Sequence, residues 1–428
     1  MIIDRNFKKE KTMSKTIEKY SFGIGDRFAR QGKAQLEALL QAKKLGVNLV
    51  PVWNKSYREH TITGTQPDTV RTEADAAVKA LGWKDSYYVD ADHVNLKNVD
   101  LFLESSDFYT LDVADFSGKP ADEAGFKAFV KAHQKFIGKL SIPGIDEPLE
   151  ITEATIEASA RKYLLAIQEA GKIYRHVEEK KGKDNFITEV SIDETDLPQI
   201  PVEMLFILSA VAREGIPAQT IAPKFTGRFN KGVDYVGDVM QFEKEFNEDL
   251  CVIAFAVKEF GLPANLKLSI HSGSDKFSIY GPIGKALKKH NAGLHLKTAG
   301  TTWLEELIGL ACAEGPGLAI SKEVYRKAFG RFDELCGPYA SVIDIDKTKL
   351  INPDEVDKWD GKKFAETLRH VQSNPAYNRH FRQLLHVGYK VAAEIGERYY
   401  QAVEDNEKVI ARNVFENLFD RHIRRVFV

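Results

Sequence analysis

The chain has 428 residues, of which 43% are hydrophobic and 29% charged, so it is large enough for one extended globular domain or two. It carries 60 basic and 62 acidic side chains and therefore lacks the basic surplus typical of nucleic-acid-binding proteins. The longest apolar run, residues 250–257, is too short to span a membrane, and the N-terminus lacks the apolar core of a signal peptide. Three scattered cysteines indicate no disulfide framework, so we expect a cytoplasmic protein.

In chain order, residues 1–17 are expected to form a tail that precedes a regular alternation of elements. Apolar runs bounded by turn residues predict strands at 20–23, 48–52, 87–89, 108–111, 187–192, 220–225, 267–271 and 293–297. Amphipathic patterns between them predict helices at 32–45, 69–81, 96–103, 197–214, 235–260, 283–290 and 303–313.

This alternation predicts a (β/α)8 barrel of the TIM type over residues 18–315, because parallel strands need helical crossovers. A helical insertion is expected at about 120–184, and residues 316–428 are expected to form a helical region packed on the barrel. An open doubly wound sheet is the alternative, but Gly23-Ile24-Gly25-Asp26 lacks the third glycine of a dinucleotide-binding loop.

Ionisable residues follow seven of the eight predicted strands, where barrel enzymes carry their catalytic groups. They are Asp26, Arg27, Asp90, Asp92, His93, Asp112, Asp115, Asp193, Glu194, Asp196, Lys224, Arg228, His271, Asp275, Lys276, His295 and Lys297.

Three histidines in this set, His93, His271 and His295, occupy equivalent strand-end positions and are candidate metal ligands. A single histidine in a strand is more often a satisfied core residue, but three leave coordination positions open for a substrate. Nitrogen-rich ligation suits Zn, Mn, Co or Ni better than Mg or Ca. We therefore expect one divalent metal ion as cofactor.

The acids and bases of the set have assignable roles. Asp92, next to a candidate ligand, is placed to act as a general base, although its loop could simply be solvated. The acids at 193–196 precede Pro198, and helix capping accounts for Asp196 but not for the other two. Substrate binding is assigned to Asp26, Arg27, Lys224, Arg228, Asp275, Lys276 and Lys297. The segment around His386 is expected to be a packed amphipathic helix rather than part of the site.

Seven ordered motifs resemble the tagaturonate/fructuronate epimerases of bacterial hexuronate breakdown, over most of residues 20–390. They are Ser21-Phe22-Gly23-Ile24-Gly25-Asp26-Arg27, Asp90-Ala91-Asp92-His93-Val94, Glu189-Val190-Ser191-Ile192-Asp193-Glu194-Thr195, Lys231-Gly232-Val233-Asp234-Tyr235-Val236-Gly237-Asp238, Ser269-Ile270-His271-Ser272-Gly273-Ser274-Asp275-Lys276, His295-Leu296-Lys297-Thr298-Ala299-Gly300-Thr301 and Gln383-Leu384-Leu385-His386-Val387. The chain departs from the family pattern in its shorter segment before the first strand and in Phe116, where members tend to have histidine.

The resemblance implies a divalent metal on His93, His271 and His295, with Asp92 and Glu194 as the acid/base pair. It also implies a keto-sugar acid as substrate, with no nucleic-acid or membrane partner; a homo-oligomer is left open. Inversion two carbons from a ketone favours retro-aldol cleavage and re-addition, and transient oxidation is the rival route. The alternatives are a metal-dependent aldolase, an epimerase of a neutral or phosphorylated ketose, and a sugar-binding sensor without catalysis.

Overall fold

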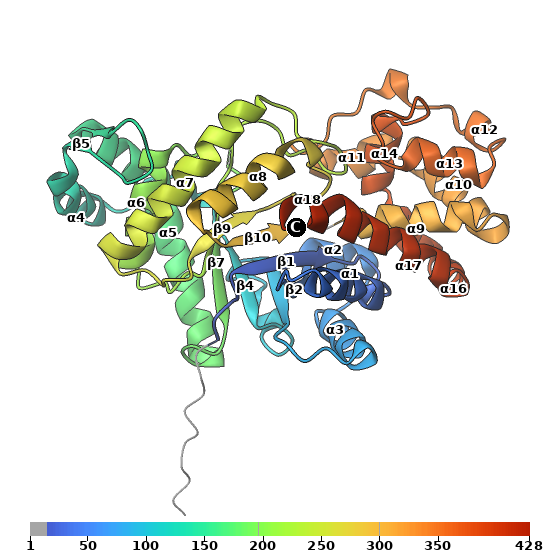
Figure 1. The fold of residues 1–428 in the computed structure, drawn as a ribbon, viewed down its shortest axis with the longest axis horizontal. Helices are drawn as coiled ribbons and strands as arrows, with labels where there is room; N and C mark the ends of the chain where they lie inside the picture. The colour runs from blue at the N-terminus through green and yellow to red at the C-terminus, as the bar shows by residue number, and fades with distance from the viewer. Residues whose placement is uncertain (1–14, 196, 299) are drawn as a thin grey trace, which may run out of the picture.

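The computed structural model describes residues 15–195, 197–298 and 300–428, and there eight parallel strands close into a barrel (Figure 1). Each strand pairs with the next, and the last pairs with the first. The strands are β1 (Tyr20–Gly25), β2 (Val50–Ser56), β3 (Tyr88–Val94), β4 (Phe108–Asp112), β7 (Ile187–Ser191), β8 (Thr220–Ala222), β9 (Lys267–Ile270) and β10 (Leu294–Lys297). The predicted barrel and its eight strands are confirmed.

The barrel interior changes from apolar to polar along the strands. Its amino-terminal end is filled by a cluster of Ile17, Val50, Val52, Tyr88, Phe108 and Ile187, so Ile17 belongs to the core and not to a tail. Side chains alternate along a strand, so the next inward positions are Asn54, Asp90, Thr110 and Glu189, which are all buried. A barrel plugged by apolar side chains at one end and lined by polar ones at the other places the chemistry at the carboxyl ends of the strands.

Helices surround the barrel and mostly follow the predicted ranges. They are α1 (Gly32–Lys44), α2 (Tyr57–Thr63), α3 (Asp68–Leu81), α5 (Glu153–Lys181), α6 (Pro201–Arg213), α7 (Val239–Phe260), α8 (Phe277–His290) and α9 (Thr301–Cys312). The helix predicted at 96–103 is wrong: only a 3-10 turn, η1 (Val99–Phe102), forms there. Leu96 and Leu101 stay exposed, so this stretch lacks the buried face that stabilises a longer helix.

The predicted helical insertion is corrected in part, because it also contains strands. After β4 and the turn η2 (Ala114–Phe116) come α4 (Glu123–His133) and η3 (Gln134–Phe136), and then a two-stranded antiparallel hairpin, β5 (Gly138–Leu140) with β6 (Leu149–Ile151). The long helix α5 packs beside α6 and forms the crossover from β4 to β7. The part of this segment that projects from the barrel is therefore α4 and the hairpin, at the left of Figure 1.

The region after α9 is helical, as predicted, and lies largely on the opposite side of the barrel from α4 (Figure 1). Its elements are α10 (Gly315–Gly330), α11 (Phe332–Cys336), η4 (Gly337–Tyr339), η5 (Lys347–Lys349), α12 (Pro353–Val356), α13 (Gly361–Leu368), α14 (Arg379–Val387), α15 (Tyr389–Ile395), α16 (Glu397–Asp405), α17 (Glu407–Glu416), the π-helix η6 (Asn417–Ile423) and α18 (Arg424–Val426). The last two return to the barrel and pack on α1 and α8.

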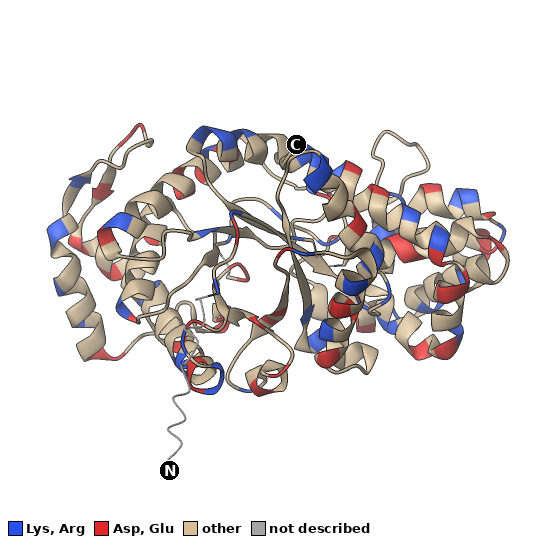
Figure 2. Ribbon diagram, turned by 60° about the horizontal axis from the view of Figure 1, so that its bottom comes forward, with Lys and Arg blue, Asp and Glu red and all other residues tan. Residues whose placement is uncertain are grey.

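Acidic and basic residues are interspersed along the helices, and both also occur on the barrel strands (Figure 2). Within the described ranges, no helix has the length and apolar character needed to cross a membrane. Cys251, Cys312 and Cys336 carry free thiols.

Candidate active site and metal centre

The end of β3 carries an acid and a histidine to the barrel mouth. The register between β3 and β4 shifts between Ala91 and Val94, and at this irregularity His93 has a φ of 54°. This left-handed conformation is uncommon for residues other than glycine and often marks a functional position. Regular alternation would send Asp92 and His93 to opposite faces, but the bulge turns the His93 ring to within 5.0 Å of the His271 ring.

His93, Asp193 and His271 form a group with the geometry of a metal centre. One potential ligand atom of each lies within 4.8 Å of the others. His271 Nδ1 is 3.1 Å from Asp193 Oδ1, yet the buried Nδ1 atoms of both histidines have no hydrogen bond within the part of the chain that the structure describes. Buried ring nitrogens are costly to leave without a partner. Two imidazoles and a carboxylate are a donor set that fits Zn, Mn, Co or Ni.

Carboxylates orient these two rings and give the group a preference for positive charge. Glu189 Oε1 lies 2.7 Å from His271 Nε2 and leaves Nδ1 facing Asp193, as carboxylates behind metal-ligating histidines do. Burial opposes protonation of His271, but Asp193 and Glu189 raise its pKa to about 9. Asp92 and Asp112 likewise outweigh burial and raise the pKa of His93. Either protons or a metal ion can satisfy this charge preference.

Lys297 is the centre of a buried ion cluster next to this group. Its Nζ lies 2.7 Å from Asp90 Oδ2, 2.8 Å from Asp92 Oδ1 and 3.0 Å from Glu189 Oε1. Burial raises the pKa of Asp90 to about 7, whereas at Asp92 the charges of Lys297, His93 and His271 together outweigh burial and lower the pKa to about 2. The contacts do not support the predicted binding of an anionic substrate by Lys297, because the amine is engaged by the chain's own acids. Lys297 holds these three carboxylates together.

His295 does not belong to the metal group, which corrects the prediction of three histidine ligands. It precedes Lys297 by two positions on β10 and so points into the barrel interior one layer deeper. Its Nδ1 is 2.9 Å from Ser21 Oγ, and its ring packs against Phe108 of the apolar plug. Burial lowers its pKa to about 3, so the ring is neutral. The third member of the group is Asp193, which the sequence placed among several strand-end acids.

Glu194 lines a cavity of about 230 Å³ together with Asp193 and His271. Its side chain is exposed, which suits a group that exchanges protons with a bound molecule. Lys224 and Arg228 line the same cavity, as their predicted role requires. Lys224 Nζ donates to the carbonyl of Thr195. Arg228 is half-exposed, and its Nη1 lies 3.9 Å from Asp344 Oδ2, which is a long separation for an ion pair. The neighbouring Asp196 lies outside the described residues.

Asp26 and Arg27 follow β1 but differ in what they contact. The Asp26 carboxylate accepts backbone N–H groups from Phe28, Ala29, Arg30 and Gln31 at 2.6 to 3.0 Å, so it holds the loop into α1 and its predicted binding role is not supported. Arg27 is buried, paired with Glu59 and stacked 4.7 Å from the Tyr389 ring centroid. Its Nε has no hydrogen bond to any residue within 15–195, 197–298 and 300–428, so toward these residues Arg27 keeps a free donor.

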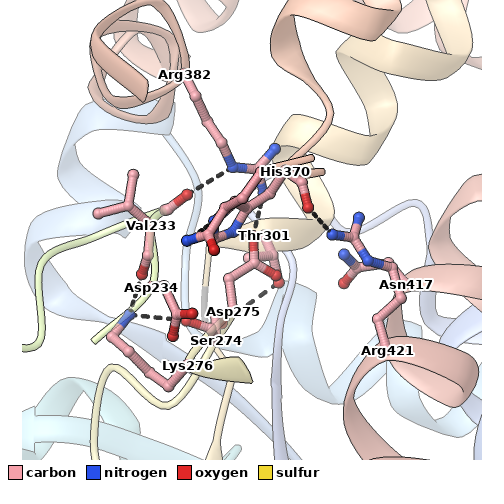
Figure 3. Close-up of polar contacts among 12 residues, drawn as sticks. Val233, Asp234, Ser274, Asp275, Lys276, Thr301, His370, Arg382, Asn417 and Arg421 are labelled. Atoms are coloured by element: carbon pink, nitrogen blue, oxygen red, sulfur yellow. Dashed lines mark hydrogen bonds and ion pairs between the residues drawn. The ribbon is translucent and has the colours of Figure 1, made fainter. Parts of the chain in front are cut away.

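Asp275 and Lys276 are committed to the fold, so the contacts do not support their predicted binding of substrate. Asp275 Oδ2 accepts from Arg382 Nη2 at 2.6 Å and from His370 Nδ1 at 3.0 Å, and these side chains are fully buried (Figure 3). Lys276 Nζ donates to the carbonyls of Asn230, Val233 and Ser274 at 2.7 to 2.9 Å. These contacts join the loop after β9 to the C-terminal helices and to the loop after β8.

Asn54 is a site residue that the sequence analysis missed. It lies at the inward position of β2 beyond Val50 and Val52, and both its amide nitrogen and its amide oxygen are buried without a hydrogen bond. A Cβ atom added at Gly23 would be 2.9 Å from Lys297 Cγ and 3.0 Å from Asn54 Nδ2, so this amide lies beside the Lys297 cluster. The signal was present in the sequence, as a polar residue where the inward alternation of β2 reaches the barrel mouth.

These features define a class: a (β/α)8-barrel enzyme with candidate acid/base groups and a candidate divalent-metal centre at the carboxyl ends of its strands. A family model described as UxaE, tagaturonate epimerase, matches residues 1–426. The chain belongs to this family and is thus an epimerase, an isomerase.

Relatives agree with this assignment. A tagaturonate/fructuronate epimerase of Thermotoga maritima is 29% identical over 422 residues, covering 94% of this chain and 80% of that protein. Crystal structures of the fructuronate-tagaturonate epimerase UxaE of Cohnella laeviribosi, native and with one glycerol bound, share the fold with a TM-score of 0.77 at 23% identity. Each alignment covers 97% of this chain and 82% of the Cohnella chain.

Proposed function

We propose that the protein interconverts tagaturonate and fructuronate in a metal-dependent reaction in the cytoplasm. The observation that carries this proposal is the His93, Asp193 and His271 group next to Asp92, in a chain that belongs to the tagaturonate epimerase family from end to end. The family indicates the sugar acid, and the donor set indicates the kind of ion.

In this proposal His93, Asp193 and His271 hold one divalent transition-metal ion. The two buried Nδ1 atoms, which have no hydrogen bond to a described residue, are the atoms that would coordinate such an ion. A bound ion would supply positive charge to the ketone oxygen and its neighbouring hydroxyl. Glu189 fixes the tautomer and the orientation of the His271 ring through Nε2.

The chemistry must invert a carbon whose hydrogen is not acidic, because that carbon is two bonds from the ketone. Its hydroxyl is β to the carbonyl, so removal of the hydroxyl proton allows the bond between this carbon and the carbon next to the ketone to break. The electron pair passes to the ketone fragment as an enediolate, and the hydroxyl carbon becomes an aldehyde. After the aldehyde rotates, attack on its other face and return of the proton restore the six-carbon acid with inverted configuration.

We assign the proton transfers to Asp92 and Glu194. Asp92 is held by Lys297 at 2.8 Å beside the metal group, and Glu194 lies on the cavity wall next to Asp193. The two acids come from different strand ends, so they can serve opposite sides of a bound sugar. Asn54, with both amide atoms free of hydrogen bonds, is placed to bind a sugar hydroxyl.

The direct test is incubation of the metal-loaded protein with each of the two uronates, followed by NMR. Interconversion without net loss of six-carbon sugar is the expected result. Release of three-carbon fragments would instead identify an aldolase. Inactivity on both uronates with turnover of a neutral or phosphorylated ketose would contradict the proposed substrate, and no change in any sugar would contradict catalysis.

A further inference from the structure

We propose that Arg27, Lys231 and His386 form the subsite that binds the carboxylate of the substrate. This inference rests on the proposed sugar-acid substrate. It adds the orientation in which that substrate binds. Lys231 comes from the loop between β8 and α7, and His386 from α14 of the C-terminal region. The subsite is therefore built jointly by the barrel and the C-terminal helices.

Arg27 and His386 converge on one point of the backbone, Gly300. A Cβ atom added at Gly300 would lie 2.7 Å from His386 Nε2 and 2.8 Å from Arg27 Nη2. Both side chains therefore pack closely against this glycine. Gly300 has a φ of 91°, which favours glycine in any case. A third segment meets them here, because a Cβ atom at Gly232 would be 3.1 Å from His386 Cδ2. Gly232 directly follows Lys231.

The loop that presents Lys231 is fixed from several sides. Lys276 Nζ donates to the carbonyl of Asn230, which precedes Lys231, and to that of Val233, which follows Gly232. Figure 3 shows the contact with Val233. Arg382 Nε donates to the carbonyl of Gly232 at 2.6 Å, and the backbone N–H of Lys231 donates to the carbonyl of Val342 at 2.8 Å. Two buried cations thus use their donors to hold three residues of this loop, Asn230, Gly232 and Val233. Such rigidity is expected of a loop that positions a ligand-binding side chain.

The Lys231 amine itself has no hydrogen bond or ion pair to any residue that the structure describes. The side chain is half-buried, and burial together with Arg27 lowers its pKa, while Glu194, Glu59 and Asp92 act in the opposite direction. Burial lowers the pKa of His386, and the charges of Arg27 and Lys231 lower it further. The ring is therefore neutral and has one N–H available as a hydrogen-bond donor. A half-buried ammonium beside a guanidinium that has a single acidic partner lacks a counterion, and a carboxylate supplies one.

The charge around the metal-site histidines argues for the same orientation. Asp92, Asp112 and Asp193 surround the two metal-site histidines, and these acids would repel a substrate carboxylate. The Arg27, Lys231 and His386 subsite attracts it instead. The sugar acid would thus bind with its carboxylate toward the C-terminal helices and its reacting hydroxyl and ketone toward His93 and His271.

The test compares two probes that differ only in the carboxylate end, D-gluconate and D-glucitol. Their binding to the metal-loaded protein is measured by calorimetry, for the wild type and for Lys231→Met, Lys231→Arg and His386→Phe. We expect Lys231→Met to weaken gluconate about ten- to a hundredfold, because a charged hydrogen bond is lost, and to leave glucitol within about twofold. Lys231→Arg should restore most of the gluconate affinity, and His386→Phe should weaken gluconate less than Lys231→Met does.

The matched control is Lys285→Met, the same change at an exposed lysine on α8, which should bind both probes like the wild type. With the uronates, Lys231→Met should raise KM more than it lowers kcat. Unchanged gluconate affinity in Lys231→Met, or an equal loss for gluconate and glucitol, would overturn the subsite. Binding does not depend on turnover, so a wild type that discriminates gluconate through Lys231 without epimerising uronates would contradict the proposed function alone.

Discussion

His271 and Asp275 are four residues apart in the sequence but belong to two different histidine–carboxylate clusters. These two clusters have opposite characters. In the first, His93 keeps 22% of its side chain exposed, and two ring nitrogens are buried without hydrogen bonds. In the second, Asp275, His370 and Arg382 are fully buried, and Asp275 Oδ2 is hydrogen-bonded to each of the other two (Figure 3). The same residue types thus make a candidate reactive centre in one place and a structural tie in the other.

The difference lies in whether each donor finds an acceptor within the protein. Around Asp275, Arg382 donates to the carbonyls of Leu368 and Gly232 as well as to the carboxylate, and His422 Nε2 accepts the backbone N–H of Asp275. At the barrel mouth, the buried Nδ1 atoms of His93 and His271 have no hydrogen bond to any residue that the structure describes. Within the same ranges Asp275 Oδ1 also lacks a hydrogen bond, but Oδ2 and the donors facing it are paired, so the second cluster is the poorer candidate for binding.

The largest effect is expected at the acid pair. Asp92→Asn and Glu194→Gln should each keep the bound metal and lower kcat about 10²–10⁴-fold, because each removes a proton carrier and no ligand. Uronate turnover followed by NMR, with metal content measured on the same samples, checks both statements. Glu407→Gln, an exposed acid at the start of α17, serves as the matched control and should retain full turnover. Losses below about tenfold in both site variants would refute the assigned roles.

A loss of stability is expected at the second cluster. Arg382→Met removes one partner of a buried ion pair and should lower the free energy of unfolding by about 3–5 kcal/mol without releasing the metal. Urea titration gives the free energy, and Arg398→Met, which breaks an exposed pair with Glu323, should cost less than about 1 kcal/mol. Equal stability of the two variants would contradict the structural role of Asp275 and its partners.

A smaller, pH-dependent effect is expected at His422, which packs on Asp275. Burial lowers the pKa of His422 to about 4, partly offset by the charge of Asp275, while Arg421 and Lys276 add to the lowering. Above about pH 6.5 the ring is neutral in both the folded and the unfolded chain. Between about pH 6.5 and pH 4 only the unfolded chain takes up the proton. The free energy of unfolding therefore decreases as the pH is lowered through this range.

From pH 7 to pH 5 this histidine should account for a loss of about 2 kcal/mol in the wild type. In His422→Gln that part of the pH dependence should vanish, as measured by urea titration at both pH values. An identical pH dependence in the two proteins would show that His422 is not held neutral by the fold.

The fold could be predicted from the sequence because buried parallel strands and their crossover helices leave a regular alternation of patterns. The errors arose where local patterns were overridden. The pattern of residues 96–103 favours a helix, but Leu96 and Leu101 stay exposed, and the β5–β6 hairpin is too short to leave a clear signal. The bulge that aims His93 was also not predicted, since it depends on the register between β3 and β4.

The site was predicted as a region, and the roles within it less well. Strand ends alone indicate which residues reach the barrel mouth. Whether a side chain is free there depends on distant partners: Asp275 is engaged by Arg382, 107 positions away, and His295 by Ser21, 274 positions away. The sequence predicts that His386 belongs to a packed helix outside the site. In the structure it lies close to Arg27 and Gly300, which are also distant in the sequence. Such long-range contacts leave no trace in local sequence patterns.

The measurement that tests the central claim most directly is the metal content of two single variants, His271→Ala and His295→Ala, after loading with Zn²⁺ and removal of free ion. Both changes remove a buried histidine from a neighbouring strand end. The structure predicts that His271→Ala loses the metal, whereas His295→Ala keeps it, because His295 bonds to Ser21 inside the barrel and not to the His93, Asp193 and His271 group. Full metal content in His271→Ala, or equal loss in both variants, would contradict the account.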